Sequence, residues 1–342
     1  MKRRMKIMMK LDLIIPTYNN KQGLFRTLFS IGLDSNVNIT IVDDCSEETY
    51  DDIIDLFSRF FSIRVLKTPK NGGPGVARQF GLSHTYGDYV IFIDTGDVFY
   101  TPNTLLTMLQ ICENNPDASM ISFGHLEERL DGLNYVGPQH NRMHGKVYKR
   151  SFLKKYGISF NPETPRANED IGFNMNCRLI CNFLENQDDI AHCLEVDEPG
   201  VIWKHDESSI TRHNDCAFYY KEQNNGLAHG ALWAINNARK AKVDKEYIDR
   251  LGYDVMTSLY LFYISTVNRR PEFSEEALEG ALFFYNNYLK NENDINAELL
   301  KDCYYNSLSL ALNDTTDPIR DKLIDLNLID FLNMLESMEE EE

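Results

Sequence analysis

Carboxylates in three places give this chain its clearest chemical signal. The pair Asp43-Asp44 follows an apolar run, and so does the sequence Asp-Thr-Gly-Asp that starts at Asp94 and ends at Asp97. A third pair, Glu169-Asp170, opens a segment with helical spacing. Carboxylates accept hydrogen bonds from ligand hydroxyl and N–H groups, so these residues are candidates for a ligand-binding site, although Glu169-Asp170 taken alone fits the N-terminus of a helix.

A glycine-rich segment lies between the first two acidic sites. Gly72, Gly73 and Gly75 surround Pro74 and lack the side chain that would keep a ligand away from the backbone. The residues that follow have helical spacing, and the N-terminus of a helix attracts anions. Arg78 in this helix adds a positive charge, although an arginine here also fits a surface ion pair. The segment therefore predicts an anion site.

These polar residues come at the ends of short apolar runs that alternate with segments of helical spacing. The expected strands are residues 11–15, 39–42, 63–66, 89–93 and 118–123, and the expected helices are 22–33, 49–60, 76–86 and 104–113. The alternation predicts an α/β fold with a mostly parallel sheet flanked by helices. Ligands bind such sheets beyond the carboxyl ends of the strands, where the polar residues are expected. Neither G-x-G-x-x-G nor G-x-x-x-x-G-K-[ST] occurs, which argues against dinucleotide-binding and P-loop folds.

The rhythm changes in the second half of the chain. Residues 125–148 are expected to contain a hairpin, residues 151–156 and 169–184 to be helical, and residues 201–204 to form a strand. From about residue 215 the spacing is helical throughout. The expected helices there are residues 217–240, 245–266, 274–289, 297–312 and 318–335. We therefore expect a basic extension (1–10), an α/β domain (11–214), a helical domain (215–338) and an acidic tail (339–342).

Composition limits the function. With 35 Lys and Arg against 52 Asp and Glu, the formal charge is −17, which argues against a protein that coats nucleic acid. No apolar run is long enough to span a membrane, and the basic start has no cleavage site of a signal peptide. The seven scattered cysteines favour reduced thiols in the cytoplasm over a zinc site at Cys177, Cys181, Cys193 and His192.

Seven short segments carry a family resemblance. In chain order they are PTYNN, IVDDCS, NGGPGVARQFGL, GDYVIFIDTGD, HGKVYKRSFL, NED and WKHDESSIT. In this order they resemble family 2 glycosyltransferases with the GT-A fold, over about residues 10–212. The resemblance implies transfer of a sugar from a nucleotide-diphosphate donor, with inversion at the anomeric carbon and usually with Mn²⁺ or Mg²⁺. UDP is the nucleotide expected from its frequency in the family.

The resemblance implies a donor site at the strand ends. Its residues are Pro16, Thr17, Tyr18, Asp43, Asp44, Gly73, Arg78, Asp94 and Thr95. Tyr18 would stack on the base, the two aspartates would read base and ribose, and Arg78 would lie near the diphosphate. As alternatives, the first three residues fit a strand-ending turn, and Asp43 and Asp44 fit helix N-caps.

The resemblance also implies a metal site and a catalytic base. Asp94, Asp97 and His205 would hold the divalent cation, although Gly96 stands where the common Asp-x-Asp-Asp pattern has a ligand. Asp170, next to Glu169, would take the proton from the acceptor hydroxyl. The alternative is that this acidic pair favours a helix N-terminus through the macrodipole. Trp203 fits either a sugar contact or a buried structural role. The other histidines receive no role: 84, 125, 140, 144, 192, 213 and 229.

Other functions remain open. A nucleotidyltransferase is disfavoured because PTYNN is not a glycine-rich, lysine-containing loop. The main alternative is a catalytically degenerate module that binds a sugar nucleotide or a partner. For the enzyme, the acceptor could be a polysaccharide, a protein or a hydroxymethylated nucleic-acid base. The helical domain would either shape the acceptor site or mediate assembly into a homo-oligomer.

Overall fold

The computed structural model describes residues 10–33, 37–138, 141–164, 166, 168–204, 217–292, 295–313 and 328–339. Its contacts divide the chain into two compact units. The first unit comprises Met1–Pro165 and Leu184–Glu207, and the second comprises Arg166–Phe183 and Ser208–Glu342. The division is not a single cut such as the boundary expected at residue 214, because residues 166–183 group with the later helices.

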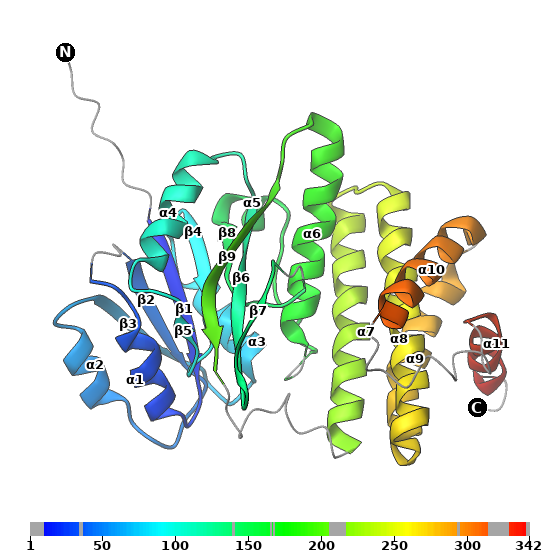
Figure 1. Ribbon diagram of the computed structural model, residues 1–342, viewed down its shortest axis with the longest axis horizontal. Helices are drawn as coiled ribbons and strands as arrows, with labels where there is room; N and C mark the ends of the chain where they lie inside the picture. Colours follow the sequence, from blue (N-terminus) through cyan, green and yellow to red (C-terminus); the bar gives the residue numbers. More distant parts are fainter. Residues whose placement is uncertain are drawn as a thin grey trace. The chain divides into compact units, whose positions relative to one another are not determined.

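The first unit is built on a nine-stranded sheet with the order β3-β2-β1-β4-β8-β6-β9-β5, and β7 pairs with β6 (Figure 1). The strands are β1 (Leu11–Thr17), β2 (Val37–Asp43), β3 (Ser62–Lys67), β4 (Tyr89–Phe92), β5 (Val98–Phe99), β6 (Met120–Arg129), β7 (Gly132–Val136), β8 (Lys146–Lys149) and β9 (Cys193–Trp203). Every residue of β1 is buried, as expected for a strand that is covered on both faces. The five strands expected in the first half of the chain are all present.

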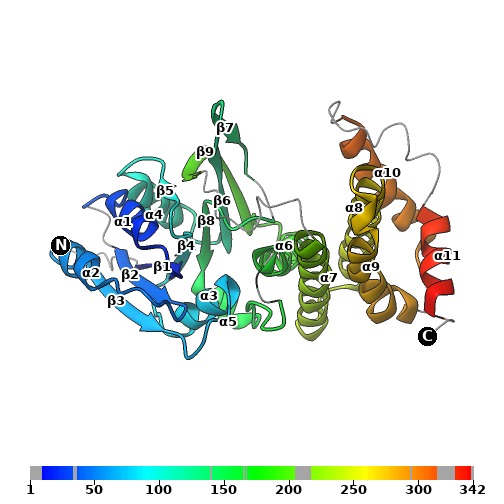
Figure 2. The same cartoon turned by 90° about the horizontal axis from the view of Figure 1, so that it is seen from below.

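Helices cover both faces of this sheet (Figure 2). They are α1 (Lys21–Phe29), α2 (Asp51–Phe57), α3 (Pro74–Ser83), α4 (Thr104–Asn114) and α5 (Arg150–Lys155). The apolar sides of α1, α2 and α4 share one core with Leu11, Leu13 and Ile15 of β1. On the opposite face α3 packs so closely that a Cβ at Gly81 would lie 2.6 Å from Ile14. Because side chains alternate along a strand, one apolar run supports both helix layers.

The sheet is mixed rather than mostly parallel. The pairs β1–β2, β1–β4 and β2–β3 are parallel, so the carboxyl ends of these strands meet at one edge. Beyond β4, however, β8 pairs antiparallel with both β4 and β6. The strands β6 and β7 form the hairpin expected within residues 125–148. The α/β class with flanking helices is therefore confirmed, and the antiparallel pairings of β8 are the part that the alternation of strands and helices did not predict.

A buried ion pair joins the two halves of the sheet at the edge opposite to the carboxyl ends. Arg150, just after β8, donates to the carboxylate of Asp12 on β1 at 2.9 Å. The same guanidinium donates to Thr85 at 2.6 Å and to the carbonyl of Gly87 at 2.7 Å. With its donors paired in this way, Arg150 locks β1, β4 and β8 together without leaving a buried charge unsatisfied.

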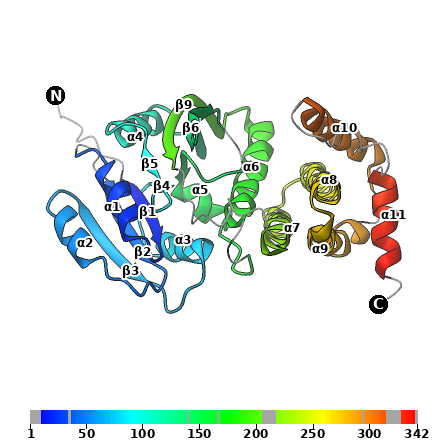
Figure 3. The ribbon, with the colours of Figure 1, turned by 60° about the horizontal axis from the view of Figure 1, so that its bottom comes forward.

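The second unit is entirely helical in its described part (Figure 3). Its helices are α6 (Glu169–Asp188, of which residues up to Phe183 belong here), α7 (Ala217–Lys240), α8 (Lys245–Arg269), α9 (Ser274–Asn287), α10 (Ala297–Asn313) and α11 (Leu328–Glu339). Helices α7, α8 and α9 pack on one another, α10 packs on α8, and α11 contacts α9 and α8. The expected all-helical region is confirmed, although the first part of the helix expected at 318–335 lies outside the described residues. None of the described helices has the length and apolar character that a membrane span requires.

Helices α6 and α7 approach each other through a pair of glycines. A Cβ added to Gly172 would lie 2.6 Å from the Cα of Gly230, and one added to Gly230 would lie 2.9 Å from the Cα of Gly172. Both obstacles are backbone atoms, which cannot rotate away. Just before α6, Asn168 has a φ of 58° and donates its side-chain amide to the carbonyl of Gln223 on α7 at 2.8 Å. The start of α6 is therefore fixed to α7.

We predict that Gly172→Ala destabilises the protein. The added methyl group must push two helix backbones apart, at a cost of about 1–3 kcal/mol for overpacking. This exceeds the roughly 1 kcal/mol of helix propensity that alanine gains over glycine. Thermal unfolding followed by circular dichroism should show a lower midpoint. Gly137→Ala is the control, because a Cβ there meets nothing within 4 Å, and an unchanged midpoint in Gly172→Ala would contradict the close packing.

Candidate functional site

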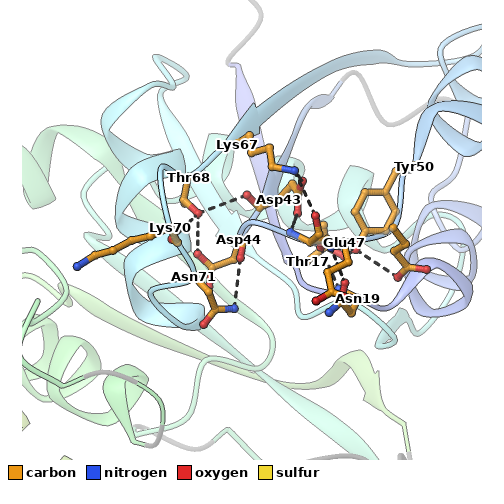
Figure 4. Close-up of polar contacts among 12 residues, drawn as sticks. Thr17, Asn19, Asp43, Asp44, Glu47, Tyr50, Lys67, Thr68, Lys70 and Asn71 are labelled. Carbon is orange, nitrogen blue, oxygen red and sulfur yellow. Dashed lines mark hydrogen bonds and ion pairs between the residues drawn. The ribbon is translucent and has the colours of Figure 1, made fainter.

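The turns that follow β1 and β2 are hydrogen-bonded to each other at the carboxyl edge of the sheet (Figure 4). The amide of Asp44 donates to the carbonyl of Thr17 at 2.8 Å. Asn19, with a φ of 46°, donates its amide to the Ser46 hydroxyl at 2.9 Å and accepts from the amide of Glu47 at 2.9 Å. The ring of Tyr18 is left 48% exposed. The structure thus brings the predicted donor-site residues of β1 and β2 together, with one aromatic face open to solvent.

Asp43 and Asp44 are both buried, and they have different partners. Asp43 accepts from the amide of Ser46 at 2.8 Å and pairs with Lys67 at 3.1 Å. Both oxygens of Asp44 accept hydrogen bonds from the glycine-rich segment, with the amide of Gly73 at 2.7 Å from Oδ2. Neither aspartate caps the following helix α2, which has no side-chain cap. Asp44 instead shapes the loop before α3, and its predicted contact with a nucleotide stays a prediction.

The glycine-rich loop after β3 leads to the N-terminus of α3. Gly73 occupies the N-cap with a φ of 87°, a backbone conformation that glycine adopts without strain, and Pro74 begins the helix. One turn into α3, Arg78 is 2% exposed and donates to Asp94 at 2.5 Å. Its guanidinium also lies 5.9 Å from the centre of the Phe160 ring. Arg78 is therefore a buried cation beside the Asp-Thr-Gly-Asp segment and not part of a surface ion pair.

The Asp-Thr-Gly-Asp segment after β4 is held by a hydroxyl group from α1. The buried Thr27 accepts from the amide of Gly96 at 2.9 Å and donates to the carbonyl of Asp97 at 2.8 Å. Thr95 donates to the carbonyl of Pro16 at 2.6 Å, which ties this turn to the end of β1. The φ of Gly96 is 109°, so a residue with a side chain would be strained at this position. The backbone here thus explains why no carboxylate stands at position 96.

Three side chains around this turn have the chemistry of a metal site. One ligand atom each from Asp94, Asp97 and His144 lie within 4.8 Å of one another. His144 Nε2 lies 3.6 Å from Asp97 Oδ2. The other oxygen of Asp97 accepts from the amide of Lys204 at 3.0 Å. Within the described part of the chain this is the one cluster of three or more such groups, and sequence analysis had given His144 no role.

Charge and burial act differently on the members of this cluster. Burial acts to raise the pKa of Asp94, but the charge of Arg78, helped by His144 and the hydrogen bond from Arg78, holds it below its usual value. Burial lowers the pKa of His144 to about 3. The neighbouring His125 is affected in the same way, and burial lowers its pKa to about 4. At neutral pH the cluster therefore has an ionised Asp94 beside a neutral imidazole.

Of the remaining predicted site residues, the structure describes Glu169 and Asp170 but not His205. Glu169 and Asp170 begin α6 in the second unit, Glu169 buried and Asp170 half-buried, with the acidic first turn that a helix macrodipole favours. His205, the predicted third metal ligand, lies outside the described residues. The cysteines that the structure describes form no disulfide, and no group of three that includes a cysteine was found there for a metal.

Comparison with known proteins identifies the first half of the chain. The sequence model of the family described as Glycosyl transferase family 2 matches residues 12–169. Over these residues the chain is similar to family 2 glycosyltransferases. The match covers the four strand ends described above, from the turn after β1 to the start of α6.

Named relatives agree with this assignment. The chain is 25% identical over 210 residues to poly(ribitol-phosphate) beta-N-acetylglucosaminyltransferase TarS of Staphylococcus aureus, which is 56% of this chain and 36% of that protein. It is 28% identical over 283 residues to a poly(ribitol-phosphate) beta-glucosyltransferase of Bacillus spizizenii, 71% of this chain and 40% of the other. An uncharacterized glycosyltransferase of Haemophilus influenzae is 33% identical over 129 residues, 37% of this chain and 42% of its own length. The chain spans less than half the length of each of these relatives.

A solved structure shows the same fold. Residues 1–349 of S. aureus TarS, crystallised with UDP-GlcNAc, superpose with a TM-score of 0.51 at 16% identity, covering 84% of this chain and 93% of the other. At this identity the likeness concerns the fold alone. It confirms the expected GT-A architecture, with its sheet, its flanking helices and a helical C-terminal part.

We predict that Asp44→Asn destabilises the glycine-rich turn. An asparagine would present an NH₂ group to backbone amides that need acceptors, leaving buried donors unpaired at a cost of about 1–3 kcal/mol. The midpoint of thermal unfolding should fall, and amide exchange at Gly72 and Gly73 should accelerate. Asp55→Asn, on the exposed side of α2, provides the control. Unchanged exchange at these two glycines would show that Asp44 does not hold the turn.

Proposed function

We propose that this protein transfers a sugar from a UDP-sugar donor to an acceptor hydroxyl, with inversion at the anomeric carbon. The observation that carries the proposal is that the turns after β1, β2 and β4 meet at the edge of the sheet where the buried Arg78 pairs with Asp94. The family match supports nucleotide-sugar chemistry, and the TarS structure with UDP-GlcNAc supports UDP as the nucleotide.

The strand ends supply complementary contacts for such a donor. The exposed ring of Tyr18 would stack on the uracil. Asp43, whose carboxylate is held in place by Lys67 and the Ser46 amide, would accept hydrogen bonds from the base or the ribose. The first backbone amides of α3 and the guanidinium of Arg78 would face the diphosphate. Negative charge grows on the diphosphate as the sugar departs, and Arg78 would stabilise it there.

Asp94 and Asp97 fit a divalent cation, which family 2 enzymes usually require. Their carboxylates project from one turn, and oxygen ligands suit Mg²⁺ and Mn²⁺. When bound, the cation supplies positive charge to the leaving diphosphate. The two aspartates hold it, and the Arg78 ion pair keeps Asp94 ionised for that task.

Asp170 is the proposed general base. It would accept the proton of the acceptor hydroxyl while that oxygen forms its bond to the anomeric carbon and the bond to the diphosphate breaks. A single displacement of this kind inverts the anomeric carbon. The contacts between α6 and α7, through Gly172 and Asn168, would fix the helix that carries the base. Glu169, which is buried beside it, would help to orient that first turn.

For the acceptor, the relatives favour one of the classes left open by the sequence. Two of them are named for transfer to poly(ribitol-phosphate). We therefore propose a hydroxyl of a cell-surface polymer, in preference to a protein or a nucleic-acid base. Exposed Arg142, whose guanidinium lies 5.2 Å from the centre of the Trp203 ring, would suit an anionic polymer of this kind.

We predict that Asp170→Asn removes most of the transferase activity and leaves donor binding intact. Loss of a general base lowers turnover by about 10²–10⁴-fold. Turnover is measured as UDP release from UDP-sugars in the presence of poly(ribitol-phosphate), and donor binding by calorimetry. Asp117→Asn, an exposed aspartate between α4 and β6, is the matched control. Normal turnover in Asp170→Asn would remove the assigned base, and donor binding without turnover in the wild type would favour a degenerate binding module.

A further inference from the structure

His144 is a side chain at the site to which the proposed transfer reaction gives no task. We propose that it is the nitrogen ligand of the divalent cation held by Asp94 and Asp97, and that it makes this site prefer Mn²⁺ to Mg²⁺. The inference rests on the proposed function only in that it concerns the same metal site. It does not depend on the identity of the sugar or of the acceptor.

His144 lies beside the carboxylates of Asp94 and Asp97. Its Nε2 lies 3.6 Å from Asp97 Oδ2, and one ligand atom of each of the three residues falls within 4.8 Å of the others. A cation between them would need only short movements of the side chains to reach bonding distance. Asp94, Asp97 and His144 also line one small cavity together with Phe92, Ile93, Met143 and Val201. The space between the three polar groups is therefore enclosed on its other sides by apolar atoms.

Gly96 limits the number of ligands that its turn can supply. Its φ of 109° disfavours any side chain, so this turn offers the cation only the carboxylates of Asp94 and Asp97. His144 reaches the same space from the loop before β8, about fifty residues further along the chain. It thus fills the coordination position that position 96 cannot fill.

The imidazole of His144 is held between two neighbouring aromatic rings. His144 lies between two rings, with the His125 ring centre at 5.0 Å and an interplanar angle of 28°, and the Trp203 ring centre at 5.2 Å and 32°. This stack restricts the ring to one plane. Within the described residues, His144 Nδ1 is buried and has no hydrogen-bond partner. Because no hydrogen bond at Nδ1 fixes which ring nitrogen faces the carboxylates, either Nδ1 or Nε2 is available as the ligand atom.

The donor set then determines which metals bind well. Mg²⁺ prefers oxygen ligands in a near-ideal octahedral arrangement, whereas Mn²⁺, as a transition-metal ion, accepts a nitrogen ligand beside carboxylates more readily than Mg²⁺ does. Two carboxylates and one imidazole would therefore favour Mn²⁺ over Mg²⁺. Replacing His144 with aspartate gives an all-oxygen set and should reduce that preference.

The test uses Mn²⁺ as the probe, on the full chain, with and without UDP. Mn²⁺ binding is followed by electron paramagnetic resonance, and pulsed measurements detect nitrogen bound to the metal. Protein labelled with ¹⁵N-histidine should show a ¹⁵N coupling. His144→Gln should lose this coupling and weaken Mn²⁺ binding by on the order of tenfold or more. His144→Asp should lose the coupling too, yet still bind Mn²⁺ and compete better for Mg²⁺. His84→Gln is the control, because this ring contacts the carbonyl of Phe80 on α3, away from the cluster.

Several outcomes would overturn the inference. These are the absence of histidine coupling in the wild-type complex, a coupling that persists in His144→Gln but is lost in His205→Gln, and no Mn²⁺ binding at all. The proposed function fails separately, if UDP itself does not bind in calorimetry. A wild type that binds UDP without a nitrogen coupling thus rejects His144 as a ligand and leaves the transferase proposal standing.

Discussion

The site depends on one constraint. Backbone amides in the turns at the carboxyl edge of the sheet are buried, and each of these amides needs a hydrogen-bond acceptor. Parallel pairing of β1 with β2 and β4 brings three of these turns together. Asp43 accepts the amide of Ser46, Asp44 accepts that of Gly73, and the hydroxyl of Thr27 accepts that of Gly96. An unpaired buried donor costs about 1–3 kcal/mol, so side chains that pair with these amides fix the backbone where a donor would bind.

The same logic applies to the charges at this edge. Arg78 is almost fully buried, and a buried cation is tolerated only when a counter-charge is close. Asp94 supplies that charge at 2.5 Å and is itself kept ionised by the pair. Arg78 would therefore serve the diphosphate and Asp94 the metal while each satisfies the other. In this account the anion and cation contacts of the donor are coupled through one ion pair.

Local patterns in the sequence were sufficient for the elements and for part of the site. Apolar runs identified the strands of the parallel half, and helical spacing gave α7 with the bounds that the structure has. The glycine-rich turn and the Asp-Thr-Gly-Asp segment were recognisable because each consists of neighbouring residues. The antiparallel pairing of β8 with β4 and β6 was not predicted, because it depends on contacts between segments far apart in the sequence.

Long-range contacts also explain what was missed within the site. Thr27 is an ordinary buried threonine in the sequence, and its task appears only when α1 lies beside the turn after β4. His144 gave no signal, because its partners Asp97 and Trp203 are about fifty to sixty residues away on either side. The role of Gly96 was unreadable for a different reason: the positive φ that excludes a side chain is a property of the folded turn.

The central claim is that this sheet edge binds a nucleoside diphosphate, and calorimetry tests it most directly. UDP, GDP, CDP and dTDP are each titrated into the full chain with Mn²⁺ and again with EDTA. The account predicts that UDP binds more tightly than the other three and that EDTA weakens its binding. Failure of all four to bind would contradict the claim, and binding of UDP that EDTA leaves unchanged would contradict the proposed use of Asp94 and Asp97 as metal ligands.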